Sequence, residues 1–199
     1  MKRGPLYTVL FAAALGVACA ALLTGARELT AARRAENEKA DQMRHILDVL
    51  GVDRSAARSN RDLMAVYEAN VKVERRGGLN FYRYEGPGGQ VRAVAVPFSG
   101  QGLWGTIKGY LALEPDLKTL RRVTFYEHVE TPGLGAEIEK PAFRLQFEGM
   151  RVLLPDGTVG LQVQGIPGAT LTSKRVRAML QATLEEVLKA PGTEENHGR

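Results

Sequence analysis

The chain opens with its longest apolar stretch. No charged residue occurs from Leu6 to Ala26, and Lys2 and Arg3 stand just before it. About 20 apolar residues in a helix that rises about 1.5 Å per residue span the hydrocarbon core of a bilayer. We therefore expect residues 1–26 to be a membrane anchor built from one N-terminal transmembrane helix.

Two other interpretations of this stretch stay open. Small residues at Ala18-Cys19-Ala20 and Thr24-Gly25-Ala26 are compatible with cleavage of a signal peptide. In a lipoprotein Cys19 would carry the lipid, although Ala20 to Leu23 continue the apolar run where a polar tether is expected. Basic residues flank both ends of the stretch, so charge counting alone leaves its orientation open.

A helical pattern follows the anchor. Glu28 to Leu50 contains no Gly or Pro, and its apolar stripe ends before Gly51, a candidate C-cap. The stripe has helical spacing and consists of Met43, Ile46, Leu47 and Leu50. We expect residues 27–53 to be a connecting helix that docks on the domain.

A second helix is predicted from Ser55 to Glu74, with Arg75-Arg76-Gly77-Gly78 as its break. Its inward-facing side chains are expected to be Leu63, Met64 and Tyr67. The predicted domain extends from residue 54 to residue 190.

Beyond residue 80 the pattern changes to the alternation typical of strands. Strands are predicted at Phe81–Tyr84, Val91–Val96, Thr106–Leu113 and Leu120–His128, with a hairpin of Val152–Leu154 and Val159–Val163 around Pro155-Asp156-Gly157. Gly86-Pro87-Gly88-Gly89 and Glu114-Pro115-Asp116-Leu117 supply turns. A final helix is expected over Ser173–Ala190, followed by a polar tail at 191–199. Adjacent strands and a closing helix predict an α+β domain with an antiparallel sheet and packed helices.

Composition removes several function classes. The net charge of +5 arises from basic and acidic residues that alternate along the chain, and no basic block is interleaved with aromatic residues, so we expect no nucleic-acid binding. The single cysteine, Cys19, excludes an internal disulfide and a cysteine-based metal pair. The three histidines lack metal-ligand spacing, and no G-x-S-x-G motif is present, so neither a metal site nor a serine nucleophile is predicted.

Gly100 to Gly105 matches the G-x-G-x-x-G fingerprint of dinucleotide-binding folds. That fingerprint requires a helix directly afterwards, whereas Thr106–Leu113 has the alternation of a strand. We therefore reject the dinucleotide interpretation and expect a glycine-rich loop that presents Trp104. A lone Trp is usually a core residue, but beside such a loop it can also stack on a flat ligand.

Two further segments contain candidate binding residues. Glu130-Thr131-Pro132-Gly133-Leu134-Gly135 is a rigid loop, although composition alone favours an ordinary turn between strands. Gly168-Ala169-Thr170-Leu171-Thr172-Ser173-Lys174 precedes or opens the last helix. Free N–H groups at a helix start bind phosphate well. The alternative is a plain N-cap, with Thr172 or Ser173 as the capping residue.

These three segments, in this order, resemble the FMN-binding C-type subunit of the sodium-translocating NADH:quinone reductase. The resemblance covers Ser99 to Glu114, Thr124 to Gly135 and Gly168 to Ser173, and it extends to the single N-terminal anchor. The G-type subunit of the related Rnf electron-transport complex shares the later two motifs. The longer match over the first segment favours the sodium-translocating reductase.

The resemblance implies an FMN whose phosphate a flavin transferase joins to a threonine hydroxyl as a phosphoester. The family pattern is Asp, two variable residues, Ser or Thr, Gly, Ala and the modified Thr, which is Thr170 here. Gln164 and Pro167 depart from the pattern. Noncovalent FMN in the same pocket is therefore an alternative to the covalent bond.

The expected FMN-binding residues are Trp104, Glu130, Thr131, Leu134, Gly135, Gly168, Ala169, Thr170, Leu171, Thr172, Ser173 and Lys174. The resemblance implies a single-pass protein of the bacterial inner membrane with its domain on the periplasmic side. It would relay electrons with other membrane subunits of a redox complex and would not be catalytic alone. The G-type Rnf subunit and a flavin-free anchored assembly subunit are the alternative functions.

Overall fold

The structure is a computed structural model that describes residues 4–154 and 157–190. The expectations for Lys2 and Arg3, for Pro155-Asp156 and for the tail at 191–199 lie outside the described residues. The chain divides into residues 1–41 and residues 42–199, and each part is described by itself. The predicted limits of the anchor, connecting helix and domain stay predictions.

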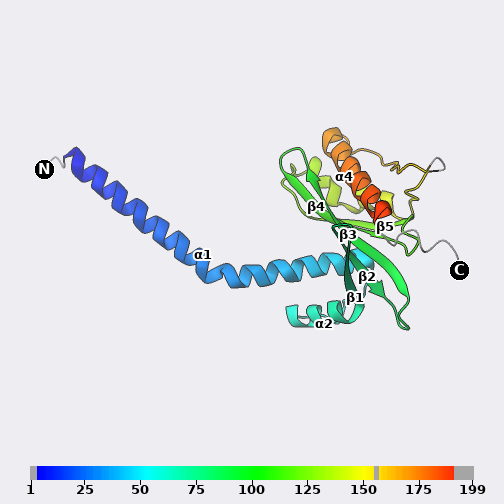
Figure 1. The fold of residues 1–199 in the computed structure, drawn as a ribbon. Coiled ribbons are helices and arrows are strands. Elements are labelled where there is room, and N and C mark those ends of the chain that lie inside the picture. The colour runs from blue at the N-terminus through cyan, green and yellow to red at the C-terminus, as the bar shows by residue number, and fades with distance from the viewer. Residues whose placement is uncertain (1–3, 155–156, 191–199) are drawn as a thin grey trace. The chain divides into compact units, whose positions relative to one another are not determined.

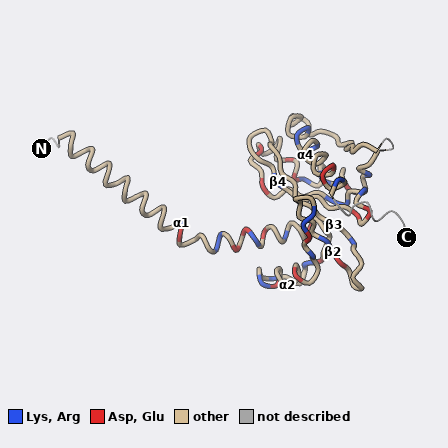
Figure 2. The backbone as a smooth tube through the Cα atoms, viewed as in Figure 1, with Lys and Arg blue, Asp and Glu red and all other residues tan. Residues whose placement is uncertain are grey.

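Helix α1 (Pro5–Leu50) runs without a break through the predicted junction at residue 26 (Figure 1). Among the described residues it is the one helix long and apolar enough to cross a membrane. Figure 2 shows that its N-terminal portion carries no charged residue, and its large apolar side chains are exposed within the chain. The helix ends as predicted, because Gly51 has a positive φ of 72° and the Val52 amide donates to the Leu47 carbonyl at 2.9 Å.

The second part is built on a five-stranded antiparallel sheet in the order β1-β2-β3-β4-β5 (Figure 1). The strands are β1 (Val71–Arg76), β2 (Leu79–Glu85), β3 (Val91–Gln101), β4 (Thr106–Leu113) and β5 (Leu120–Glu127). Each strand pairs with its sequence neighbours, which short turns permit. The predicted α+β class with an antiparallel sheet is confirmed, and four strands lie at or near their predicted positions.

The face of the sheet toward helix α4 (Thr170–Lys189) contains the main core. Alternate strand residues project from it and meet the apolar stripe of α4; this core includes Val96, Ile107, Leu111, Val176, Leu180 and Leu184. The apolar residues of α4 that face the sheet are buried, and Leu188 is half-buried. Burial of this kind stabilises the domain by about 25 cal/mol for each Å² of apolar surface removed from water.

The opposite face of the sheet carries a row of aromatic rings. Tyr110 lies 5.8 Å from Tyr82 and 5.2 Å from Tyr126 between ring centroids, and His45 near the end of α1 lies 5.8 Å from Tyr126. Arg122 of β5 donates to the Asp48 carbonyl of α1 at 2.8 Å. The last turns of α1 therefore dock on this face, as the apolar stripe predicted.

The predicted helix over Ser55–Glu74 is wrong at both ends. Helix α2 spans Asn60–Asn70, begins at a capping box of Ser59 and Asp62, and gives way to strand β1. Gly77 and Gly78 both have positive φ, which allows the two-residue turn that joins β1 to β2. This pairing overrides the helical propensity of residues 71–76. Met64 is 43 % exposed and not inward-facing, whereas Leu63 is buried.

Three further differences concern the C-terminal half. Helix α4 begins three residues earlier than predicted, at Thr170. The described residues of the predicted hairpin make a single bridge between Leu153 and Val159 and no strand. Residues 135–147, for which no element was predicted, form η1 (Gly135–Glu139), α3 (Pro141–Arg144) and η2 (Leu145–Phe147).

Candidate functional site

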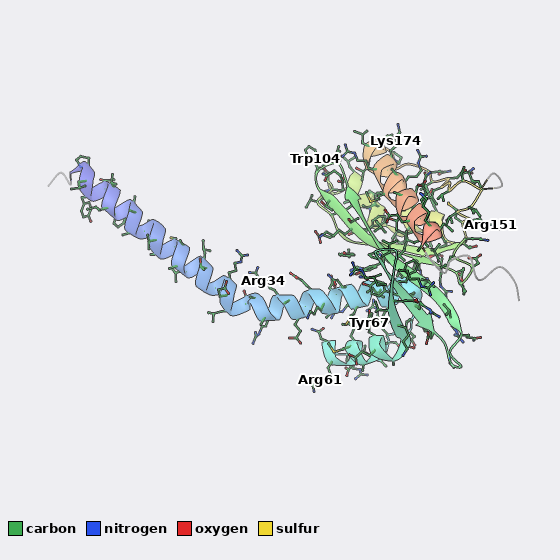
Figure 3. All side chains as sticks on the ribbon, in the orientation of Figure 1. Arg34, Arg61, Tyr67, Trp104, Arg151 and Lys174 are labelled. Carbon is green, nitrogen blue, oxygen red and sulfur yellow. The ribbon has the colours of Figure 1, made fainter. Side chains whose placement is uncertain are left out.

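Three segments that are distant in the sequence meet at one edge of the domain. They are the loop at 102–105 between β3 and β4, the loop at 128–135 after β5, and the first turn of α4. Figure 3 shows Trp104 and Lys174 at this same edge. The rejection of the dinucleotide interpretation is confirmed, because the glycine-rich loop leads into strand β4 and not into a helix.

The Glu130 carboxylate joins the three segments. Its Oε1 atom accepts hydrogen bonds from the backbone amides of Leu103 at 2.7 Å and Trp104 at 3.2 Å. Its Oε2 atom accepts from the Thr172 hydroxyl at 2.7 Å. Glu130 is only 5 % exposed, so these bonds replace the water that a carboxylate otherwise requires. The expected binding residue is thus a buried link between the loops.

The glycines of the first two motifs make room for this carboxylate. A Cβ atom on Gly102 would lie 2.5 Å from Glu130 Oε1, and one on Gly135 would lie 2.5 Å from Oε2. Both distances are far below van der Waals contact. A glycine at each position is therefore a packing requirement of Glu130, which explains why these loops contain glycine where they approach one another.

The loop at 102–105 is fixed by its own bonds and by α4. The Gly102 amide donates to the Gly105 carbonyl at 2.7 Å, and the Arg175 guanidinium donates to the Gly102 carbonyl. Trp104 is nonetheless 69 % exposed, so it is not a core residue. The other exposed large apolar side chains of the three segments are Leu103, Val129, Leu134 and Leu171.

Hydrogen bonds within the loop after β5 fix its conformation. The Thr131 carbonyl accepts the amides of Leu134 and Ala136, both at 3.1 Å. The Glu130 amide donates to His128 Nδ1 at 3.2 Å. A Cβ atom on Gly168 would lie 3.0 Å from the Leu134 side chain, which places Leu134 against the segment before α4. The predicted residues of this loop and of the α4 start are therefore brought together.

The N-terminus of α4 has no cap. Its N-cap residue, Ala169, cannot provide a side-chain bond, and the first helix amide with a backbone acceptor is that of Ser173, which donates to the Ala169 carbonyl at 3.0 Å. In the part of the chain that the structure describes, the amides of Thr170, Leu171 and Thr172 have no acceptor. No acidic residue lies in this first turn, while Lys174 is exposed there. The free amides and this charge suit an anion.

The predicted capping role of Thr172 or Ser173 is wrong because both hydroxyls are buried and used elsewhere. The Thr172 hydroxyl donates to Glu130, and the Ser173 hydroxyl donates to the Ala169 carbonyl at 3.0 Å. Thr170 differs from both. It is exposed, and its hydroxyl makes no hydrogen bond with any described residue. Of these three hydroxyls, the one on Thr170 alone is accessible to a reagent from solution.

Two side chains position the segment before Thr170. The Gln164 amide donates to Gln146 Oε1 at 2.8 Å, and Gln146 Nε2 donates to the Gln164 carbonyl at 3.4 Å. The Ile166 amide donates to Ser173 Oγ at 2.9 Å. Sequence reasoning missed Gln146 and Arg175, because both contact backbone atoms of residues far along the chain and neither belongs to a local motif.

The described residues contain no group of His, Cys, Asp or Glu side chains able to hold a metal ion. Residues 102–185 match the FMN-binding domain family. This match covers the glycine-rich loop, the loop after β5 and most of α4.

Named relatives agree with this match. The C-type subunit of the Na(+)-translocating NADH-quinone reductase from Pasteurella multocida is 26 % identical, over 85 % of this chain and 85 % of that protein. The corresponding subunit from Yersinia pestis is 37 % identical, over 63 % of this chain and 53 % of that protein. The predicted resemblance to the C-type subunit of this reductase is confirmed.

Solved structures share the fold. The C-type subunit of the Na(+)-translocating NADH-quinone reductase from Parabacteroides distasonis has a TM-score of 0.65 and 27 % identity, and the match covers 78 % of this chain and 94 % of that one. Shewanella oneidensis NqrC has a TM-score of 0.64 and 22 % identity, over 74 % of this chain and 93 % of that one.

Proposed function

We propose that this chain is the FMN-carrying, C-type electron-transfer subunit of a sodium-translocating NADH:quinone reductase, with the FMN phosphate esterified to Thr170. The observation that supports it most directly is the exposed Thr170 hydroxyl, which is free at the start of an uncapped helix. The relatives described above carry the name of this reductase, which favours it over the Rnf alternative.

The residues present fit such a group. A phosphate esterified to Thr170 would face the free amides of Thr170, Leu171 and Thr172, where N–H groups and the helix dipole stabilise negative charge. The exposed side chains of Trp104, Leu134 and Leu171 supply apolar surface for a flat ring next to that phosphate. FMN supplies the electron-transfer chemistry, and this chain holds and orients it.

Attachment forms a bond between Thr170 Oγ1 and the flavin phosphorus. Because a free phosphate does not condense with an alcohol in water, the donor must be activated as a phosphoanhydride such as a flavin dinucleotide. The nucleoside monophosphate leaves with the electrons of the broken P–O bond, and the hydroxyl proton passes to a base. We assign this step to a separate flavin transferase. Within the described residues, no titratable side chain bonds the Thr170 hydroxyl.

The N-terminal portion of α1 supports membrane anchoring, since it is long, apolar and uncharged. We propose a single-pass protein of the bacterial inner membrane whose domain lies on the periplasmic side. A covalent link would keep the flavin in place in a compartment without free FMN. Other membrane subunits would deliver and accept the electrons.

The test is co-expression of the full chain with a flavin transferase, followed by intact-mass measurement and fluorescence of the denatured protein in a gel. Wild type should gain the mass of one esterified FMN, and Thr170→Ala should lose both mass and fluorescence. Thr172→Ser is the matched control: it keeps the hydroxyl that bonds Glu130 and should keep the flavin. A fluorescent Thr170→Ala band would place attachment elsewhere, and an unlabelled wild type would support noncovalent FMN or a flavin-free assembly subunit.

A further inference from the structure

The buried Glu130 carboxylate accepts three hydrogen bonds from other parts of the chain. Three donors surround its two oxygen atoms, and none of the three carries a charge: the amides of Leu103 and Trp104 and the hydroxyl of Thr172. A carboxylate that only accepts is satisfied in its ionised form. Within the described residues no Lys, Arg or His lies within ion-pair distance of Glu130. The site therefore contains a buried negative charge that neutral dipoles stabilise.

This charge lies between the groups that would hold the flavin. One oxygen bonds the amide of Trp104, the exposed ring of the site. The other bonds Thr172, two residues beyond Thr170 on the same helix turn. A flavin that is tethered at Thr170 and packed against Trp104 would therefore lie near the carboxylate.

Such a charge opposes reduction of the flavin. Reduction adds negative charge to the ring, and two like charges repel more strongly where protein replaces water. We propose that the buried Glu130 carboxylate lowers the reduction potential of the flavin at this site, so that the bound cofactor becomes a stronger electron donor. The inference rests on the proposed function, because it requires FMN to be tethered at Thr170.

Other ionisable side chains near the carboxylate must be considered when its effect on the flavin potential is tested. The Arg175 guanidinium bonds the Gly102 carbonyl, one residue before Leu103, and so provides a positive charge at the same junction. Lys174 is exposed on the outer side of the helix. His128 Nδ1 accepts the Glu130 amide, so in this bond the nitrogen is unprotonated. Of these, Arg175 is expected to act in the opposite direction from Glu130.

The test is a reductive titration with dithionite and redox mediators on full chains that carry flavin, purified in detergent. Glu130→Gln keeps the length and an acceptor oxygen but removes the charge, and its midpoint potential should rise. Glu130→Asp keeps the charge and should stay near the wild-type value. Glu127→Gln removes an equal charge from an exposed glutamate that pairs with Lys108, and should leave the potential unchanged.

Equal potentials in wild type and Glu130→Gln would overturn the inference, and so would a shift of the same size in Glu127→Gln. If Glu130→Gln does not retain flavin, the shorter matched pair decides, since Glu130→Asp and Glu130→Asn differ in charge but hardly in size. Glu130→Asn should then have the higher potential, and equal potentials in this pair would contradict the inference. A wild type without flavin would instead refute the proposed function, so the two failures are distinguishable.

Discussion

Glu130 illustrates how one side chain determines the backbone around it. Its two oxygen atoms occupy the space that a Cβ atom would take at Gly102 and at Gly135. Neither glycine has a positive φ, so their requirement is close approach and not an unusual backbone conformation. The loops can differ elsewhere in sequence as long as the carboxylate keeps this space.

Gly135→Ala should therefore destabilise the domain. The new methyl group would lie 2.5 Å from Glu130 Oε2 and 2.9 Å from both Glu130 Cβ and Thr172 Oγ1. Overpacking of this kind typically costs about 1–3 kcal/mol. Gly165→Ala is the control, since its Cβ would lie 3.6 Å from Ser173 Cβ, an ordinary contact. Urea unfolding measures both; equal midpoints for the two variants would show that the loops simply separate.

At this scale the sequence identified residue types better than their roles. Thr170 and Trp104 were expected at a ligand, and their exposure is consistent with that prediction. Glu130 was expected to line a flavin ring, but both of its carboxylate oxygens are committed to other parts of the chain. Which bonds a buried carboxylate makes depends on tertiary contacts between distant segments, and no local pattern contains that information.

Among the helices, α2 and α4 begin in opposite ways. The Ser59 hydroxyl accepts the Asp62 amide at 3.2 Å, and the Asp62 carboxylate accepts the Ser59 amide at 3.0 Å, so α2 is capped from both sides. Helix α4 has no side-chain cap. The capped start of α2 needs no ligand, whereas the start of α4 has free N–H donors. Only the start of α4 lies beside the exposed Trp104 loop.

The α2 cap should make stability depend on pH. Hydrogen bonds, chiefly with the Ser59 side chain, lower the pKa of Asp62 below its ordinary value of 3.8. A lowered folded-state pKa means that the contribution is fully present above the unfolded-state pKa and is lost as pH falls through the folded-state pKa. Asp62→Asn should therefore unfold at lower urea than wild type at pH 7, and this difference should shrink toward about pH 2.

Glu68→Gln, on the exposed side of the same helix, is the control for that comparison and should leave the midpoint unchanged. A wild-type advantage that stays constant down to the lowest pH would show that the ionised carboxylate is not what stabilises the cap.

Some helices and strands were predicted from the sequence more accurately than others, and the reasons are physical. Strands β4 and β5 are rich in β-branched, aromatic and other apolar residues, so their limits could be read from the sequence. Residues 71–76 contain charged residues that suit a helix, but pairing with β2 across the Gly77-Gly78 turn makes them a strand. Short elements such as η1 and α3 exist because Ile138 and Phe143 are drawn into the core, a tertiary effect.

At the scale of the whole molecule, helices from opposite ends of the chain cover the two faces of the sheet. Helix α4 comes from the C-terminal end of the chain, and the last turns of α1 come from the N-terminal end. Burial, and to a smaller extent the nearby Tyr82, raises the pKa of Tyr67 on α2 to about 12. Residues 42–199 thus contain the complete sheet, its two coverings and the candidate site.

We therefore expect a variant that begins at Gln42 to fold and to accept flavin without a membrane. Full-length protein should stay in the membrane pellet after a carbonate wash, because its apolar helix contributes the anchoring energy. The shortened variant should be soluble and should still gain the mass of FMN at Thr170 when co-expressed with a flavin transferase. Release of the full-length protein by carbonate would argue against a retained anchor and for cleavage of the leading segment.

The way in which Gln146 holds position 164 has a consequence for recognising this site from sequence. The side-chain amide of Gln146 bonds only main-chain atoms of Gln164. A different side chain at position 164 would therefore keep both bonds that hold the segment before Thr170. A search pattern that requires an acidic residue at position 164 would therefore miss this chain, although Gly168-Ala169-Thr170 is present.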